Sequence, residues 1–210
     1  MYAEHPKFDT PPDETVLWRY MDLAKFLAMV STRTIYARRV DQFEDKWEGA
    51  VPPTFIRRVK DADDHAAKVF LQSSDRMRER FFVNCWHAST CESAALWSIY
   101  GSAGLAVRST VGRLKQAIRS VEFYLASVRY CDYEIDDWFD GNAILPCFMK
   151  RKSFEFEQEV RVVVWADTID NSWDRRLQDP STVGVELEVD IAELIESVYV
   201  SPTASPALTV

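Results

Sequence analysis

One stretch of the chain decides the fold, and it reads Phe154-Glu155-Phe156-Glu157-Gln158-Glu159-Val160-Arg161-Val162-Val163-Val164-Trp165. Apolar and polar side chains alternate along it, which predicts a β-strand. The face that suits a core carries Phe154, Phe156, Gln158, Val160, Val162 and Val164. The opposite face carries Glu155, Glu157, Glu159 and Arg161, followed by Val163 and Trp165. We therefore expect one continuous strand over residues 154–165 with its carboxylates on a single face.

A row of carboxylates on one strand face is unfavourable, because like charges on neighbouring positions repel. Arg161 or the basic run Lys150-Arg151-Lys152 can offset the repulsion, as can a cationic ligand or a cation that develops during a reaction. On one strand face, the Cα atoms of Glu157 and Glu159 are expected about 6.6 Å apart, which suits two carboxylates acting on a sugar-like substrate. The alternative is a solvated, salt-bridged sheet face without a catalytic role.

The rest of the chain mixes strand and helix patterns without a regular strand-helix-strand repeat. Strands are expected over 16–20, 33–38, 82–87, 104–108, 121–130, 183–189 and 198–200. Helices are expected over 22–30 with Asp22 as the cap, within 54–81 with an interruption near Ser73-Ser74, and over 94–100 with a stop at Gly101. Further helical segments are expected over 111–118 with Thr110 as the cap, and as a turn over 191–196. This irregular order favours an α+β fold, with mainly antiparallel mixed sheets and packed helices.

The segments between these elements set the domain organisation. Residues 1–14 are expected to be a flexible lead, and residues 15–210 a single α+β domain that is either truncated or frayed at its C-terminus. Residues 40–51 and 167–181 are expected to be loops. The acidic segment 132–142 is expected to be a loop or lid that exposes Trp138 and Phe139.

Composition excludes several classes of protein. A net charge of −8 argues against attachment to nucleic acid by bulk charge, although local arginine clusters leave that reading open. No apolar run approaches the roughly 18 residues of a membrane span, and no signal peptide opens the chain, so a cytoplasmic protein is expected. Glycine occurs only 6 times and forms no phosphate-binding loop, which argues against P-loop and Rossmann nucleotide sites.

Metal binding is also not expected. The spacing Cys85-x-His87-x-x-x-Cys91 calls for a check, but the chain has no Cys-x-x-Cys pair. The 4 cysteines are expected to be reduced thiols.

The order of the short motifs carries a resemblance. The motifs are Leu17-Trp18-Arg19-Tyr20, Asp41-Gln42-Phe43-Glu44-Asp45-Lys46-Trp47-Glu48-Gly49, Cys85-Trp86-His87, Leu96-Trp97-Ser98-Ile99-Tyr100-Gly101, Gly104-Leu105-Ala106-Val107, Val128-Arg129-Tyr130 and the run from Lys152 to Arg161. Together they resemble the bacterial domain-of-unknown-function family twenty-nine seventy-one over residues 17–202. The chain departs from that family in Glu44-Asp45-Lys46-Trp47 and in Trp86-His87.

The layout is also similar to the ADP-ribosyltransferase fold, in which an early strand bears Arg or His and a late strand bears Glu-x-Glu. This likeness implies that Arg19 holds a phosphate or ribose, that Glu159 binds a ribose hydroxyl and that Glu157 orients the acceptor. The middle Ser-Thr-Ser element of those enzymes has no clean match here. The aromatic wall for nicotinamide would come from Trp97, Tyr100 or Trp86, and core packing is the alternative for each ring. Trp97 and Tyr100 are expected on one helix, with Trp97 largely buried.

The candidate site therefore has Glu157 and Glu159 as catalytic carboxylates. Its ligand-binding residues are Arg19, Trp97, Tyr100 and Arg161. The resemblance implies an ADP-ribosyltransferase or an NAD glycohydrolase of a phage-defence or toxin system. NAD would be a substrate and not a permanently bound cofactor, and the acceptor a protein or a nucleic acid. The alternative is a non-catalytic binding or sensor module of a bacterial defence system.

Overall fold

The computed structural model describes residues 1–61, 65–100, 104–169 and 182–204. Its strands are β1 (Val16–Met21), β2 (Thr34–Arg39), β3 (Phe81–Ala88), β4 (Leu105–Thr110), β5 (Tyr124–Ser127), β6 (Arg129–Cys131), β7 (Met149–Arg151), β8 (Glu159–Trp165), β9 (Gly184–Glu188) and β10 (Ser197–Val200). Its α-helices are α1 (Leu23–Thr32), α2 (Pro53–Asp61), α3 (His65–Arg78), α4 (Ala94–Tyr100), α5 (Val111–Ala117) and α7 (Ile191–Leu194). The predicted α+β class with a mainly antiparallel sheet is confirmed.

The stretch 154–165 is not one strand, so that prediction is wrong in its first part. Residues Lys152–Glu157 form a 3-10 helix, η3, and β8 begins only at Glu159. Gln158 lies between them in the left-handed conformation, with φ of 41°. A residue with positive φ ends the helix and redirects the chain, which periodicity cannot reveal. Within β8 itself the predicted alternation holds, since Val160, Val162 and Val164 all lie in the core.

The main sheet branches at β3. Strand β8 pairs with β3 from Phe81 to His87 along one edge. The other edge pairs with β2 at Phe82 and Val83, and with β1 only at His87 and Ala88. Strands β1 and β2 therefore diverge on the same edge of β3, and the sheet is split beside residues 84–86. In this split the side-chain Nδ2 of Asn84 donates a hydrogen bond of 2.8 Å to the carbonyl oxygen of Tyr36.

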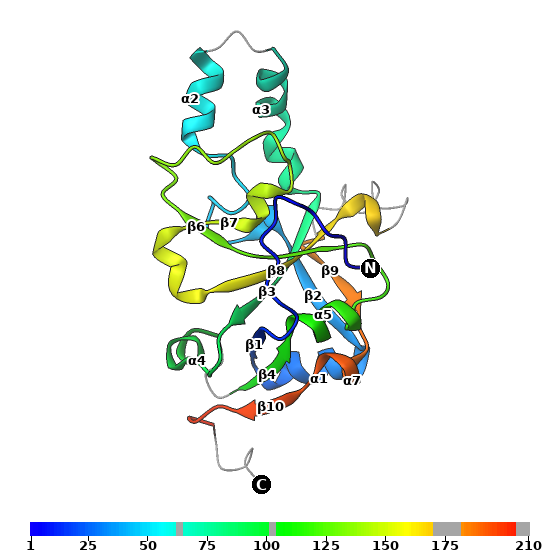
Figure 1. Ribbon diagram of the computed structural model, residues 1–210. Helices are drawn as coiled ribbons and strands as arrows, with labels where there is room; N and C mark the ends of the chain where they lie inside the picture. Colours follow the sequence, from blue (N-terminus) through cyan, green and yellow to red (C-terminus); the bar gives the residue numbers. More distant parts are fainter. Residues whose placement is uncertain (62–64, 101–103, 170–181, 205–210) are drawn as a thin grey trace.

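Helices and loops cover the two faces of the sheet. Helices α1, α5 and α7 gather on one side in Figure 1, and they contribute Met29, Leu114 and Leu194 to the largest core. The opposite face of β3 and β8 is covered by residues from the segment 131–149, which form a second core. Helices α2 and α3 lie side by side at one end of the molecule (Figure 1), and β10 lies at the other end.

Several local predictions are corrected by this packing. Phe139, expected to be exposed, is 2% exposed, and its ring packs against Phe55 of α2 and Phe70 of α3. Trp138 is also partly buried beside it. Helix α3 runs through Ser73 and Ser74 without the expected interruption, and both hydroxyls donate to carbonyl groups of the preceding turn.

The expected lead over residues 1–14 lies against the sheet. The amide of Ala3 donates to the carbonyl oxygen of Phe123 at 2.8 Å, and the amide of Ser127 donates to that of Asp9 at 2.8 Å. Phe8 is buried in the second core. The expected helix stop at Gly101 and most of the expected loop 167–181 lie outside the described residues. None of the described helices combines the length and the apolar run that crossing a bilayer requires.

Candidate functional site

A pocket of about 710 Å³ opens where the sheet splits. Its lining includes Arg19 from β1, His87 from β3, Tyr100 from α4, Lys150 from β7 and the two carboxylates Glu157 and Glu159. The volume lies within the range of about 300–1,000 Å³ that is usual for small-molecule sites. The structure thus places four of the six candidate site residues, Arg19, Tyr100, Glu157 and Glu159, on one pocket.

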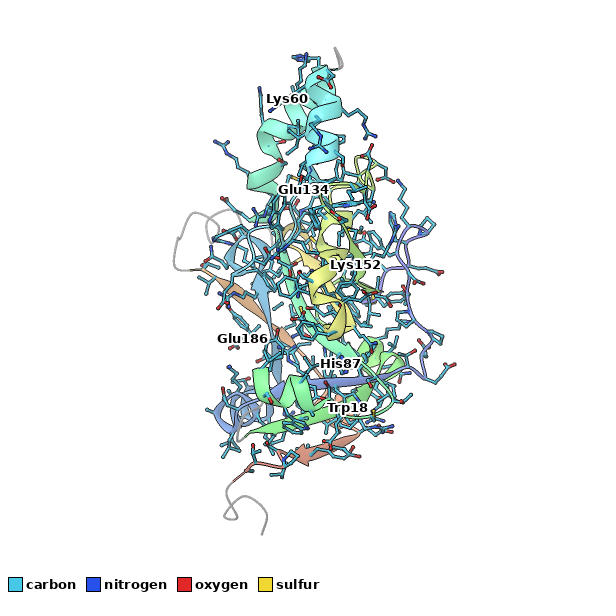
Figure 2. All side chains as sticks on the ribbon, turned by 90° about the vertical axis from the view of Figure 1, so that its left-hand side faces the viewer. Trp18, Lys60, His87, Glu134, Lys152 and Glu186 are labelled. Atoms are coloured by element: carbon cyan, nitrogen blue, oxygen red, sulfur yellow. The ribbon has the colours of Figure 1, made fainter. Side chains whose placement is uncertain are left out.

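Strand register explains how residues from different sheet faces reach the same pocket. His87 is paired with Glu159 on one side and with Trp18 on the other, so these three side chains share a face. Figure 2 shows His87 close to Trp18. Arg19 follows Trp18 and therefore points to the opposite face. It reaches the pocket through the split, where its Nη2 donates to the carbonyl oxygen of Tyr36 at 3.3 Å.

A buried ionic cluster of five side chains lies at the pocket, and four of them, Glu48, Lys150, Glu157 and Glu159, line it. Lys150 donates to both Glu157 and Glu159, the latter at 2.7 Å, and its Nζ lies 3.4 Å from a Glu48 oxygen. Arg161 holds Glu48 through two hydrogen bonds of 2.8 and 3.0 Å and also donates to Glu159. All five residues are less than 10% exposed. Three carboxylates against two cations leave one net negative charge when all five are ionised.

The two carboxylates on β8 and η3 have different protonation properties. Burial alone would raise the pKa of Glu159, but Arg161 and Lys150 outweigh it and hold the pKa well below its usual range. Burial raises the pKa of Glu157 to about 7, and the neighbouring Glu159 adds to the effect against the opposing pull of Lys150. The ionised form of Glu159 is therefore favoured, whereas the pKa of Glu157 lies near neutral pH. Such a divergence is common where one carboxyl group stabilises charge and the other moves a proton.

Further contacts fix the position of Glu157. The Tyr100 hydroxyl donates to Glu157 Oε1 at 2.8 Å. The ring nitrogen Nδ1 of His87 lies 2.7 Å from the Glu157 carbonyl oxygen. Because these partners come from α4 and β3, Glu157 is held by elements on two sides of the pocket.

Arg19 is an unusual cation in this site. Its Nη1 is buried and has no hydrogen-bond partner, and its guanidinium lies 5.8 Å from the centre of the Trp86 ring. Burial lowers the pKa of Arg19 to about 10, only partly opposed by Cys85. Among the described residues Arg19 forms no ion pair, and its contacts are the Tyr36 carbonyl oxygen and the Trp86 ring. A buried donor without a partner calls for an explanation, and an anionic ligand would supply one.

Two candidate residues lie elsewhere. Trp97 is buried under β1, where its ring packs against Tyr20 and its Nε1 donates to Glu92 at 2.9 Å, so it does not line the pocket as the described residues define it. Its burial on the same helix as Tyr100 was predicted and is confirmed. Arg161 is 1% exposed and lies beneath Glu159, where it supports that carboxylate and does not line the described pocket.

Sequence reasoning missed three members of the site. Glu48 was assigned only to a loop, Lys150 only to a basic run, and His87 only to a weak metal motif. The pairing Lys150–Glu157 had a local signal in the short spacing between the basic run and the carboxylates. Within the described residues no group of three His, Cys, Asp or Glu side chains is arranged to hold a metal ion.

Comparison with known proteins identifies no relative: no protein-family model matches the chain, and no curated protein or solved structure matches it. The family resemblance and the ADP-ribosyltransferase layout therefore stay predictions.

Proposed function

We propose that the pocket binds a nucleotide-like ligand that contains ribose, such as NAD, and that the protein is an ADP-ribosyltransferase-like enzyme or an NAD glycohydrolase. The observation that carries this proposal is the shared pocket of Arg19 and Glu159. Arg19 offers a buried, unpartnered donor that suits a phosphate oxygen. Glu159 offers an ionised carboxylate that suits a ribose hydroxyl. One ligand with both groups would satisfy both residues.

The charges of the site suit the chemistry. Cleavage of nicotinamide from its ribose builds positive charge on the sugar, and a fixed carboxylate stabilises that charge most in a site shielded from water. Glu159 is fixed by Lys150 and Arg161 and stays ionised. Glu157, with its pKa raised to about 7 by burial, is suited to accept the proton of the attacking hydroxyl. The half-exposed Tyr100 ring offers an aromatic surface for nicotinamide.

The fold is part of the same proposal. An antiparallel sheet that splits around a nucleotide pocket supports an ADP-ribosyltransferase-like arrangement, with Arg19 on the first strand and Glu157-x-Glu159 on a late one. A role in phage defence or in a toxin system, with a protein or nucleic-acid acceptor, follows from the resemblance alone.

Calorimetry with NAD and ADP-ribose, together with a nicotinamide-release assay, tests the proposal. Arg19→Gln should weaken binding of both ligands about 10-fold or more, the effect expected for losing a charge-assisted hydrogen bond. Glu159→Gln should lower nicotinamide release about 100-fold or more. Glu155→Gln is the matched control, because Glu155 is exposed on the same helix η3 and should leave both readouts unchanged. Absence of NAD and ADP-ribose binding to a folded wild-type protein would refute the proposal.

A non-catalytic binding module is the second candidate, and one observation favours it. Both carboxylate oxygens of Glu159 already accept hydrogen bonds from buried cations. If the protein is a binding module, the wild-type protein binds the nucleotide but releases no nicotinamide, and Glu159→Gln changes only the affinity. The release assay therefore separates the two functions.

A further inference from the structure

His87 occupies a distinctive position beside the carboxylates. It is paired across β3 and β8 with Glu159, so the two side chains project from the same face. The Cα atoms of directly opposed antiparallel residues lie only about 4.5–5.5 Å apart. The ring is 7% exposed, and it lines the pocket.

The hydrogen bond to Glu157 fixes the tautomer of His87. The partner of Nδ1 is the Glu157 carbonyl oxygen at 2.7 Å, and a carbonyl oxygen can only accept. Nδ1 therefore carries the proton, and in the neutral ring Nε2 is left with a lone pair. Among the described residues, Nε2 has no hydrogen-bond partner. In its neutral form the ring thus offers Nε2 as an acceptor next to Glu159.

The neighbouring donors of the pocket are engaged by the carboxylates. Tyr100 donates its hydroxyl proton to Glu157, and Lys150 donates to both Glu157 and Glu159. The two oxygens of Glu159 have four lone pairs between them; two accept from Lys150 and Arg161, and a third accepts from Glu157 when that group is protonated, which leaves one acceptor position. His87 and Glu159 together therefore present two free acceptor positions to a ligand with two neighbouring donors.

We propose that His87 is a specificity-determining residue that reads a vicinal diol: Nε2 accepts from one ribose hydroxyl while Glu159 accepts from the adjacent one. This inference rests on the ribose-binding role of Glu159 proposed above and narrows the ligand class to ribonucleotides with both hydroxyls free. Deoxyribonucleotides and ribonucleotides phosphorylated on the diol lack one of the two donors, and the site discriminates against them.

Adenosine 5′-monophosphate, its 2′-deoxy analogue and its 3′-deoxy analogue are suitable probes for calorimetry. Wild-type protein should bind the ribonucleotide about 5–10-fold more tightly than either deoxy analogue, the value of one hydrogen bond. His87→Asn retains an amide that can donate to the Glu157 carbonyl oxygen but has no acceptor at the Nε2 position. This variant should bind the ribonucleotide no more tightly than the deoxy analogue that lacks the hydroxyl read by His87. Its affinity for that analogue should equal the wild-type affinity. His65→Asn, at the exposed start of α3, is the matched control and should retain both preferences.

A second readout does not depend on any ligand. A long-range ¹H–¹⁵N spectrum of the free protein at about pH 8 should show His87 protonated at Nδ1 alone. Protonation at Nε2 instead, equal wild-type affinity for the three nucleotides, no measurable affinity for any of them, or an unchanged preference in His87→Asn would each overturn the inference. If the nucleotides behave as expected but NAD neither binds nor releases nicotinamide, the diol site stands and the proposed enzyme function fails.

Discussion

Replacing Arg161 by Met should be among the most damaging single substitutions in this chain. The guanidinium is 1% exposed and donates to both oxygens of Glu48, to Glu159 and to the Cys147 carbonyl oxygen. Methionine fills much of the aliphatic volume but supplies neither charge nor donors. Glu48 and Glu159 would then share Lys150 as their remaining cation.

The expected cost follows from the charge left behind. Removing one partner of a buried ion pair costs about 3–5 kcal/mol, because the other partner stays desolvated and uncompensated. For a chain of this length that loss corresponds to a fall in Tm of roughly 6–20 °C. The double variant Arg161→Met with Glu48→Gln removes the uncompensated carboxylate as well, and should recover about 1–3 kcal/mol of the loss.

Chemical denaturation of the single and double variants measures these values. Arg151→Met is the matched control: its side chain is 40% exposed and pairs with Asp45, so the cost should stay below about 1 kcal/mol. A loss below about 1 kcal/mol for Arg161→Met, or no recovery in the double variant, would show that the cluster is solvated or that its carboxylates are already protonated.

Three further substitutions test separate features. Trp97→Ala should lower the free energy of unfolding by about 3–5 kcal/mol, because it leaves a cavity at a buried site, and should not change nucleotide affinity. A loss of affinity without a loss of stability would show that Trp97 contacts the ligand. Because burial raises the folded-state pKa of Glu157 to about 7, above its unfolded value, this group stabilises the fold at low pH, and its contribution is lost as pH rises toward about 7. Glu157→Gln should therefore flatten the pH dependence of unfolding free energy between about pH 5 and 7, and an unchanged slope in the variant contradicts the raised pKa. Gln158→Gly should stabilise the protein by roughly 0.5–1 kcal/mol, because Gln158 has φ of 41° and glycine adopts that conformation without a steric penalty. A destabilised variant would show that contacts of the Gln158 side chain stabilise the fold by more than the backbone strain destabilises it.

Elements with local signals were predictable from sequence. Asp22 and Thr110 were expected to cap helices, and both side chains accept a hydrogen bond from the amide three residues later. Alternation located β1, β3 and β9 to within a few residues because the period-two pattern records burial of one face. The same pattern misled at residues 154–158, since alternation is also compatible with a short 3-10 turn followed by a left-handed residue.

The sequence by itself thus determined the α+β class, most element positions and the choice of Arg19, Glu157 and Glu159 as candidates. Tertiary structure decided what surrounds them. Glu48 and Arg161 are 113 residues apart, and no local pattern connects them. The divergence of β1 and β2 along β3 depends on pairings between distant strands, and Arg19 reaches the pocket of Glu159 at this divergence. Local propensity depends on neighbouring residues, whereas the burial of a carboxylate depends on which distant cations the folded sheet places beside it.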